Sequence, residues 1–176
     1  MGFNYATSNI GASHCYGYGA QDVWGAPVPK KVNRFDEGNA EVVVYNQDHA
    51  AMNEIGIICA FSAGWGWVPD IYGKMLAAST GVKQAADPAY LLKVGERILN
   101  MERAFNVREG FGRKDDTLPV RMLTENLIVD GVPNEAARVK DLQGFLDRYY
   151  AVRGWTQNGA PAKAKVKELG LEYILK

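Results

Sequence analysis

The amino-acid sequence predicts a single, mostly α-helical domain over residues 1–176. Apolar residues recur at helical spacing in several segments, and residues that favour helix ends stand at the borders of those segments. Only the segments VVVY and NLIVDG have a strand-like pattern. No repeat or linker divides the chain, and its length is sufficient for one hydrophobic core.

The first 38 residues are rich in glycine, asparagine, serine and aromatic residues, a composition that favours irregular chain. We expect one short helix there, near Tyr16. From Asn39 the apolar residues take a mostly helical spacing that continues to Ile58. Val42–Val44 alone also fits a strand, but the longer pattern favours a helix.

The stretch SAGWGWVP interrupts this helix. Its Trp65 and Trp67 either line a ligand pocket or anchor the loop to the core, and the second role is the more common one. Pro69 is well placed in the first turn of the next helix, PDIYGKMLAAST, which Gly81 ends.

The clearest helix is predicted from Pro88 to about Asn106. Asp87 is a good N-cap, and proline is favoured at the first helical position. An apolar stripe runs along this segment and consists of Leu91, Leu92, Ile98, Leu99, Met101 and Phe105.

Two further helices are predicted near the end of the chain. Asn134 is expected to cap EAARVKDLQGFLDRYYAVRG, which ends at Gly154. The last helix, PAKAKVKEL, is expected to begin at Pro161 and to stop at Gly170. Glycine readily adopts the left-handed conformation that commonly terminates helices.

The composition argues against several classes of protein. Lysine plus arginine and aspartate plus glutamate both number 20, so no net charge favours a nucleic acid or an anionic membrane. There is no run of 18 apolar residues and no signal-peptide pattern, so we expect no membrane insertion and a cytoplasmic location. Cys15 and Cys59 favour a reducing compartment over a disulfide scaffold, and no CxxC or HxxxH spacing indicates zinc.

The stretch RAFNVREGFGRKDDTLPVR, residues 103–121, concentrates charges around two glycines and a proline. A solvated helix would space its charges three or four residues apart and would avoid glycine and proline. We therefore expect a helix end followed by an ordered loop. Its charges are expected to form a structural lock that ties the helix end at Asn106 to the closing helices and to domains outside this sequence, because arginine can bridge two acceptors. Direct catalysis is the less favoured role.

Short motifs alone do not assign a function. His14 lies among small residues in SNIGASHCYGYG, where it either bonds to a nearby carbonyl or faces a ligand, and the first role is the more common. Cys59 is expected to be a small buried apolar residue. His49 is placed on the polar side of its helix and receives no role. No P-loop, dinucleotide fingerprint or catalytic triad is present.

One long segment closely resembles the signature of the tungsten-containing aldehyde:ferredoxin oxidoreductases: GERILNMERAFNVREGFGRKDDTLPVR. The family's closing segment is similar to LDRYYAVRGWTQNGAPAKAKVKELGL, and its Gly-Ala-Cys-His stretch is similar to ATSNIGASHCYGYG. The resemblance covers essentially the whole chain. It implies the helical C-terminal domain of enzymes several times longer, present here as a truncated chain, a split gene or an incomplete reading frame.

The resemblance implies roles for three residues of the N-terminal loop. His14 matches the family histidine that faces the tungsten and the substrate and exchanges a proton with a reacting oxygen. Gly11 and Tyr16 are expected to contact the cofactor. Cys15 and Tyr16 stand where the family usually has leucine and a basic residue, so Tyr16 can donate a hydrogen bond but cannot neutralise a phosphate.

The segment NEIGIICAF resembles the family's Asp-x-x-Gly-Leu-Cys motif. Asn53, Gly56 and Ile57 are accordingly expected to contact the pterin, and Cys59 is expected to be the fourth cysteine ligand of a 4Fe–4S cluster. Cys59 lies one residue later than the motif requires, which leaves Ile58 at the ligand position. On a helix, that offset turns a side chain by about 100°.

The implied function is that of a tungsten or molybdenum pterin oxidoreductase, which interconverts aldehydes and carboxylates with ferredoxin as the electron carrier. The departures from the family motifs indicate a divergent branch acting on larger substrates, such as aromatic acyl thioesters. The expected partners are the missing pterin-binding and middle domains, which also supply the other three cluster cysteines, and ferredoxin. We expect the chain alone to hold no cofactor and to be inactive.

The alternative is a non-catalytic helical module that keeps the fold and binds a partner subunit. The positions of His14 and Cys59 discriminate between the two functions. If neither residue lies near a cavity or interface that a cofactor can enter, the non-catalytic module is favoured.

Overall fold

The computed structural model describes residues 1–23, 25–26, 29–32, 39–61, 69–134 and 138–175. The predicted interruption SAGWGWVP, with Trp65 and Trp67, lies outside these residues except for its last position, Pro69. No helix in these ranges is both long enough and apolar enough to cross a membrane.

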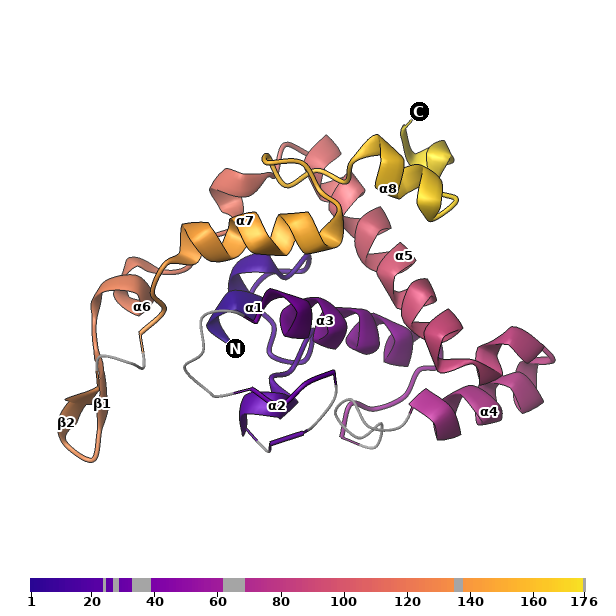
Figure 1. Cartoon of the computed structure of the whole chain (residues 1–176), viewed down its shortest axis with the longest axis horizontal. Helices are drawn as coiled ribbons and strands as arrows, with labels where there is room; N and C mark the ends of the chain where they lie inside the picture. Colours follow the sequence, from indigo (N-terminus) through magenta and orange to yellow (C-terminus); the bar gives the residue numbers. More distant parts are fainter. Residues whose placement is uncertain (24, 27–28, 33–38, 62–68, 135–137, 176) are drawn as a thin grey trace.

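The chain is mostly helical, as predicted (Figure 1). The α-helices are α1 (Gly2–Thr7), α2 (Ala20–Val23), α3 (Ala40–Ile55), α4 (Pro69–Thr80), α5 (Pro88–Arg108), α6 (Val120–Thr124), α7 (Leu142–Arg153) and α8 (Lys163–Glu168). The other elements are the 3₁₀ helices η1 (Lys83–Ala86), η2 (Arg113–Asp115) and η4 (Glu172–Leu175), and the strands β1 (Leu127–Val129) and β2 (Val132–Asn134).

Helix α3 is the central element, since α1, α5 and α7 all contact it. Figure 1 shows α7 lying across α1 and α3, while α5 passes the end of α7 and continues to α4. The crossing of α3 and α5 is close because position 95 is glycine. A Cβ atom at Gly95 would collide with the backbone oxygen of Asp48 on α3.

The prediction for α5 is confirmed. The Asp87 side chain accepts a hydrogen bond from the Ala89 backbone nitrogen at 2.9 Å, and Pro88 occupies the first turn. The helix ends at Arg108, two residues beyond the predicted Asn106.

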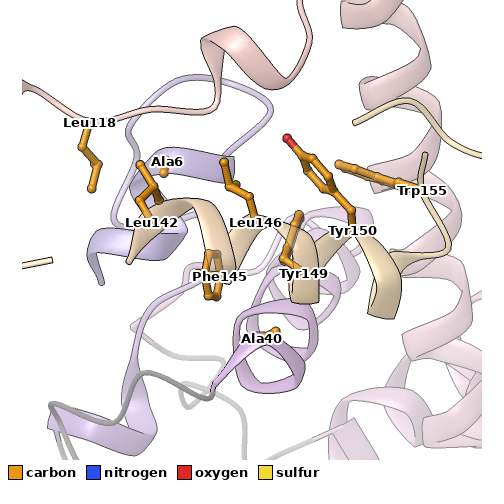
Figure 2. Close-up of a cluster of buried hydrophobic side chains, with 9 residues drawn as sticks. All are labelled: Ala6, Ala40, Leu118, Leu142, Phe145, Leu146, Tyr149, Tyr150 and Trp155. Atoms are coloured by element: carbon orange, nitrogen blue, oxygen red, sulfur yellow. The ribbon is translucent and has the colours of Figure 1, made fainter. Parts of the chain in front are cut away.

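The main hydrophobic core lies between α7, α1 and α3 (Figure 2). It consists of Ala6, Ala40, Leu118, Leu142, Phe145, Leu146, Tyr149, Tyr150 and Trp155. The ring of Phe3 on α1 stacks on Phe145 with centroids 3.8 Å apart. A second cluster of Met52, Tyr72, Ala85 and Leu91 joins α3 to α4, η1 and α5.

The N-terminal segment differs from its prediction. Residues 2–7 form α1, and the chain around Tyr16 is a turn, with the next helix beginning at Ala20. A six-residue helix has little stability of its own, so α1 depends on tertiary contacts. These contacts bury Ala6 and Thr7. The segment VVVY lies in a helix and not in a strand.

The predicted N-cap at Asn134 is wrong. Asn134 ends β2, which pairs antiparallel with β1 in a hairpin formed by the strand-like segment NLIVDG and the residues that follow. The turn residues Asp130 and Gly131 both have positive φ angles, as tight hairpin turns require. Helix α7 begins only at Leu142, where the Asp141 side chain accepts from the Gly144 nitrogen at 3.0 Å.

The ends of the last two helices were predicted more accurately than their starts. Gly154, with φ of 67°, caps α7 in the left-handed conformation, and Gly170 follows the end of α8 with the same angle. Helix α8 begins at Lys163, two residues after the predicted Pro161, which pairs instead with Trp155 in an isolated bridge.

The charged stretch 103–121 contains the predicted lock. The Arg103 guanidinium donates two hydrogen bonds of 2.7 Å to Asp116, and its Nε donates to the Gly159 oxygen at 2.7 Å. Tyr150 also donates to Asp116, and the Trp155 ring lies 4.9 Å from the guanidinium carbon. This buried group joins α5 to the following loop, to α7 and to the turn after α7.

The predicted anchor residue of the lock has a different partner. Asn106 donates from Nδ2 to the Asn9 backbone oxygen at 2.8 Å, so it holds the N-terminal segment and not the closing helices. Arg113 bonds to α7 through Asp147 at 2.7 Å and through Gln143. The Asp147 side chain is half exposed, whereas that of Asp116 is buried.

Replacing Asp116 with asparagine tests the lock. The variant Asp116→Asn leaves the buried Arg103 without its counter-charge, so we expect the free energy of unfolding to fall by about 3–5 kcal/mol. The matched variant Asp147→Asn removes an exposed ion pair and is expected to cost less than about 1 kcal/mol. Urea denaturation followed by circular dichroism measures both, and similar losses in the two variants would contradict the proposed importance of burial.

Candidate functional site

A cavity of about 340 Å³ lies between the loop that follows α1 and the C-terminal end of α3. Its lining consists of Cys15, Tyr18, Asn46, His49, Ala50, Asn53, Glu54, Ile58, Cys59, Ala60 and Phe61. The structure therefore brings together the two segments that carry the implied cofactor contacts, although they are about 40 residues apart in the sequence.

The wall contributed by α3 follows from helical spacing. His49 and Ala50 follow Asn46 by three and four residues, and Asn53 follows them by four and three, so all four share one face of the helix. This face is polar, yet Asn46, His49 and Asn53 are all buried. Polar side chains buried on one helix face indicate a site more strongly than exposed ones do.

The one-residue offset at Cys59 lies beyond the end of α3, in a segment that is not helical. The helix ends at Ile55, and Ile57 has a φ of 55°, so the helical rotation of about 100° per residue no longer applies beyond this point. Ile58 and Cys59 both line the cavity as a result. The prediction that Cys59 is buried is wrong, because its side chain is exposed at the cavity.

Gly56 and Ile57 are absent from the residues that line the cavity. A Cβ atom at Gly56 would overlap the ring and hydroxyl of Tyr72, which donates to the Met52 oxygen at 3.2 Å. Gly56 therefore allows α4 to pack closely against α3. The Ile57 side chain is 94% exposed.

The N-terminal loop contributes Cys15 and Tyr18 to the cavity, whereas the described lining does not include Gly11, His14 or Tyr16. The exposed His14 lies beside the lining, with its Nε2 3.4 Å from the Cys15 sulfur. Gly11 is exposed and has a φ of 88°, a conformation that glycine adopts without strain.

Tyr16 anchors this loop to α5. Its hydroxyl donates to Glu102 Oε2 at 2.5 Å, and its side chain is buried. Burial, and then the hydrogen bond to Glu102, raise the pKa of Tyr16 above its usual value, so the phenol stays protonated. In this structure its hydroxyl is directed to Glu102 and not to the cavity.

His49 is the residue that sequence reasoning missed. It lies on the polar side of α3, as expected, but this side is buried, and His49 is only 5% exposed. Asn53 Nδ2 lies 3.3 Å from His49 Nδ1, and the Tyr45 ring stacks on the imidazole. Burial lowers the pKa of His49 to about 4, so the ring is neutral at neutral pH. The helical spacing of His49 from Asn46 and Asn53 is a sequence signal that could have identified it.

No group of three or more histidine, cysteine, aspartate or glutamate side chains is placed to hold a metal ion among the described residues. A 4Fe–4S cluster normally requires four cysteine ligands. Cys59 offers one exposed thiol at the cavity.

The structure thus combines a mostly helical fold with a cavity between the N-terminal loop and the end of α3. Residues 1–171 match the family model "Aldehyde ferredoxin oxidoreductase, domains 2 & 3". The chain belongs to the aldehyde ferredoxin oxidoreductase family.

The curated relatives named "Tungsten-containing aldehyde ferredoxin oxidoreductase" include proteins from Pyrococcus horikoshii and Pyrococcus furiosus. The first is 36% identical over 176 residues, which are 99% of this chain and 28% of the relative. The second is 35% identical over 172 residues, which are 97% of this chain and 27% of the relative. The chain thus spans between a quarter and a third of their length.

A solved structure shares the fold. It is the "Active site complex BamBC of Benzoyl Coenzyme A reductase in complex with 1,5 Dienoyl-CoA", with a TM-score of 0.60 and 24% sequence identity. The match covers 77% of this chain and 19% of that chain. At this identity the likeness supports the helical fold alone.

The neutral state of His49 predicts a pH dependence of stability. Its folded pKa of about 4 lies below the unfolded value of 6.5, so the unfolded chain binds more protons between these values. The stability that His49 contributes is therefore present above about pH 6.5 and is lost as the pH falls towards 4. Between pH 7 and pH 5 we expect a loss of about 1–2 kcal/mol relative to His49→Gln, measured by urea denaturation.

The comparison with His49→Gln isolates this contribution. Burial raises the pKa of the neighbouring Asp48 to about 6, which acts on stability in the opposite direction. Because both proteins contain Asp48, its effect cancels in the difference. A difference in unfolding free energy that does not change with pH would show that His49 is not held neutral.

Proposed function

We propose that this chain is the C-terminal part of a tungstopterin and iron–sulfur oxidoreductase that interconverts aldehydes and carboxylates with ferredoxin as the electron carrier. The observation that supports this most directly is the cavity between the N-terminal loop and the end of α3. Both walls come from segments that resemble cofactor-binding motifs of the family to which the chain belongs. The cavity favours this function over a non-catalytic helical module.

The cofactors would supply the electron transfer when bound. The pterin-bound metal would carry out the two-electron step, and the cluster would pass the electrons on one at a time. Cys59, with an exposed thiol at the cavity, would be one ligand of the cluster. Asn53, already in contact with His49, would hold the pterin through its side-chain amide. The cofactor contacts expected of Gly11, Tyr16, Gly56 and Ile57, which lie outside the described lining, stay a prediction.

His14 would move the protons of the reaction. Oxidation of an aldehyde to a carboxylate takes an oxygen atom from water and releases two electrons and three protons, so a base near the reacting oxygen assists it. The exposed imidazole of His14 lies next to Cys15, which lines the cavity. We therefore place His14 beside a substrate bound in the cavity.

The remaining parts of the site would come from the pterin-binding and middle domains found in longer members of the family. Ile57 and Phe61 are 94% and 77% exposed beside the cavity, and apolar side chains exposed together commonly mark contact surfaces. We place these domains over this end of α3. We also propose that the charged stretch 103–121 contacts them. Two reduced thiols agree with a cytoplasmic location.

The first test concerns His14 in the enzyme assembled with its pterin-binding region. His14→Ala is expected to lower aldehyde turnover by about 10²–10⁴-fold, the usual contribution of positioned acid–base catalysis, while tungsten and iron contents stay unchanged. Ser13→Ala, in the same loop, serves as the control and should keep its activity. Unchanged turnover in His14→Ala would remove the catalytic role, and loss of pterin would make His14 a scaffold residue.

The second test concerns Cys59. The chain alone has two cysteines, so we expect it to bind no 4Fe–4S cluster after purification. In the assembled enzyme, Cys59→Ser should reduce the iron content and the cluster absorbance, whereas Cys15→Ser should leave both near the wild-type level. If Cys59→Ser kept its iron, or if Cys15→Ser lost it, the assignment of Cys59 as the cluster ligand would be wrong.

A further inference from the structure

We propose that His49 is a ligand-binding residue of this cavity, where its Nε2–H donates a hydrogen bond to the carbonyl oxygen of an uncharged molecule. The inference deepens the function proposed above, because it uses the same cavity and names the chemical class of its occupant. It depends on side chains of this chain alone and requires neither metal nor pterin.

The position of the imidazole proton follows from the contact with Asn53. An amide nitrogen is only a donor, so His49 Nδ1, at 3.3 Å from Asn53 Nδ2, accepts this hydrogen bond. A neutral imidazole that accepts at Nδ1 carries its proton on Nε2. Within the described part of the chain, His49 Nε2 has no hydrogen-bond partner, although the residue is 95% buried and lines the cavity.

A donor in this state is suited to binding a ligand. His49 Nε2 is not one of the described buried polar atoms that lack a partner, so it is open to the cavity, where a ligand acceptor can replace water as its partner. The imidazole is also held in place by neighbours one helical turn away on each side. Tyr45 stacks on it from one turn and Asn53 contacts it from the next, so little rotational freedom is lost on binding.

The surroundings of His49 favour an uncharged ligand. The imidazole is neutral, because burial lowers its pKa to about 4, so it offers no positive charge to an anion. The Glu54 carboxyl group lines the same cavity and repels anions when ionised. Ala50, Ile58 and Phe61 provide apolar surface for the body of the ligand. Aldehydes, amides and thioesters have the required carbonyl oxygen, whereas carboxylates are disfavoured.

The experiment uses the 176-residue chain labelled with ¹⁵N in its two histidines. Long-range ¹H–¹⁵N spectra at neutral pH report which imidazole nitrogen carries the proton. Benzamide is then titrated as an unreactive carbonyl probe, with toluene as a probe that lacks the carbonyl and benzoate as a charged one. We expect the Nε2–H tautomer of His49, a shift of that resonance with benzamide but not with toluene, and weaker binding of benzoate.

Two variants separate the hydrogen bond from packing. Glutamine can place its amide nitrogen near the position of Nε2, so His49→Gln should bind benzamide within about threefold of the wild type. His49→Phe keeps a ring without a donor and should bind benzamide about three- to tenfold more weakly, the loss of one hydrogen bond. Toluene affinity should stay unchanged in both variants, which also shows that the cavity is folded.

Several results would overturn the inference. In the spectra, a proton on Nδ1 or equal shifts with benzamide and toluene would contradict it. In the binding experiments, it would be contradicted by tighter binding of benzoate than of benzamide or by equal benzamide affinity in the Gln and Phe variants. Failure of all three probes to bind the wild type would also contradict it. Such a failure would leave the roles of His14 and Cys59 untouched, since turnover and iron content of the assembled enzyme decide those. An assembled enzyme without tungsten would refute the proposed function and leave carbonyl binding by His49 standing.

Discussion

The structure depends on one fully buried cation, Arg153, at the end of α7. Its guanidinium is surrounded by acceptors from α3: it forms an ion pair with Asp48 and donates to Gln47 Oε1 at 2.8 Å and to the Val44 oxygen at 3.3 Å. The Tyr149 hydroxyl receives a bond from Nε at 3.1 Å and donates to Gln47 at 2.6 Å. A buried charge is tolerated only when it is paired and hydrogen-bonded, so this set of partners sets the rotation and register of α3 against α7.

The cavity is a consequence of that constraint. Helix α3 is fixed on one side by Arg153 and on another by α5, which approaches the Asp48 backbone closely because position 95 is glycine. Helix α5 in turn holds the N-terminal loop, through the hydrogen bond from Tyr16 to Glu102. Helix contacts outside the cavity therefore position the loop and the polar face that contains His49. Sites built on rigid elements of this kind are held more precisely than sites built on loops alone.

The two buried ion pairs explain how a chain without net charge uses its charged residues. Arg153 with Asp48 joins two helices that are far apart in the sequence, whereas Arg103 with Asp116 joins α5 to the loop that follows it, and tyrosine hydroxyls complete both groups. The crowded charges of residues 103–121 divide accordingly. Asp116 forms a buried ion pair with Arg103, whereas Arg108 and Glu109 pair at the surface, where ion pairs contribute little to stability.

The sequence by itself determined the helical class, the family resemblance and the helix ends that depend on neighbouring residues. The Asp87 cap, Pro88 and the left-handed Gly154 act within about four residues, so local pattern was sufficient to predict them. The helical pattern after Asn134 predicts that α7 begins there, but Asn134 instead pairs with Leu127 of β1 across the hairpin. Only the tertiary structure decided that His49 is buried, that Tyr16 turns to α5, and that Ile58 and Cys59 reach one cavity. Burial and partner choice arise from contacts between residues far apart in the chain, which no local pattern records.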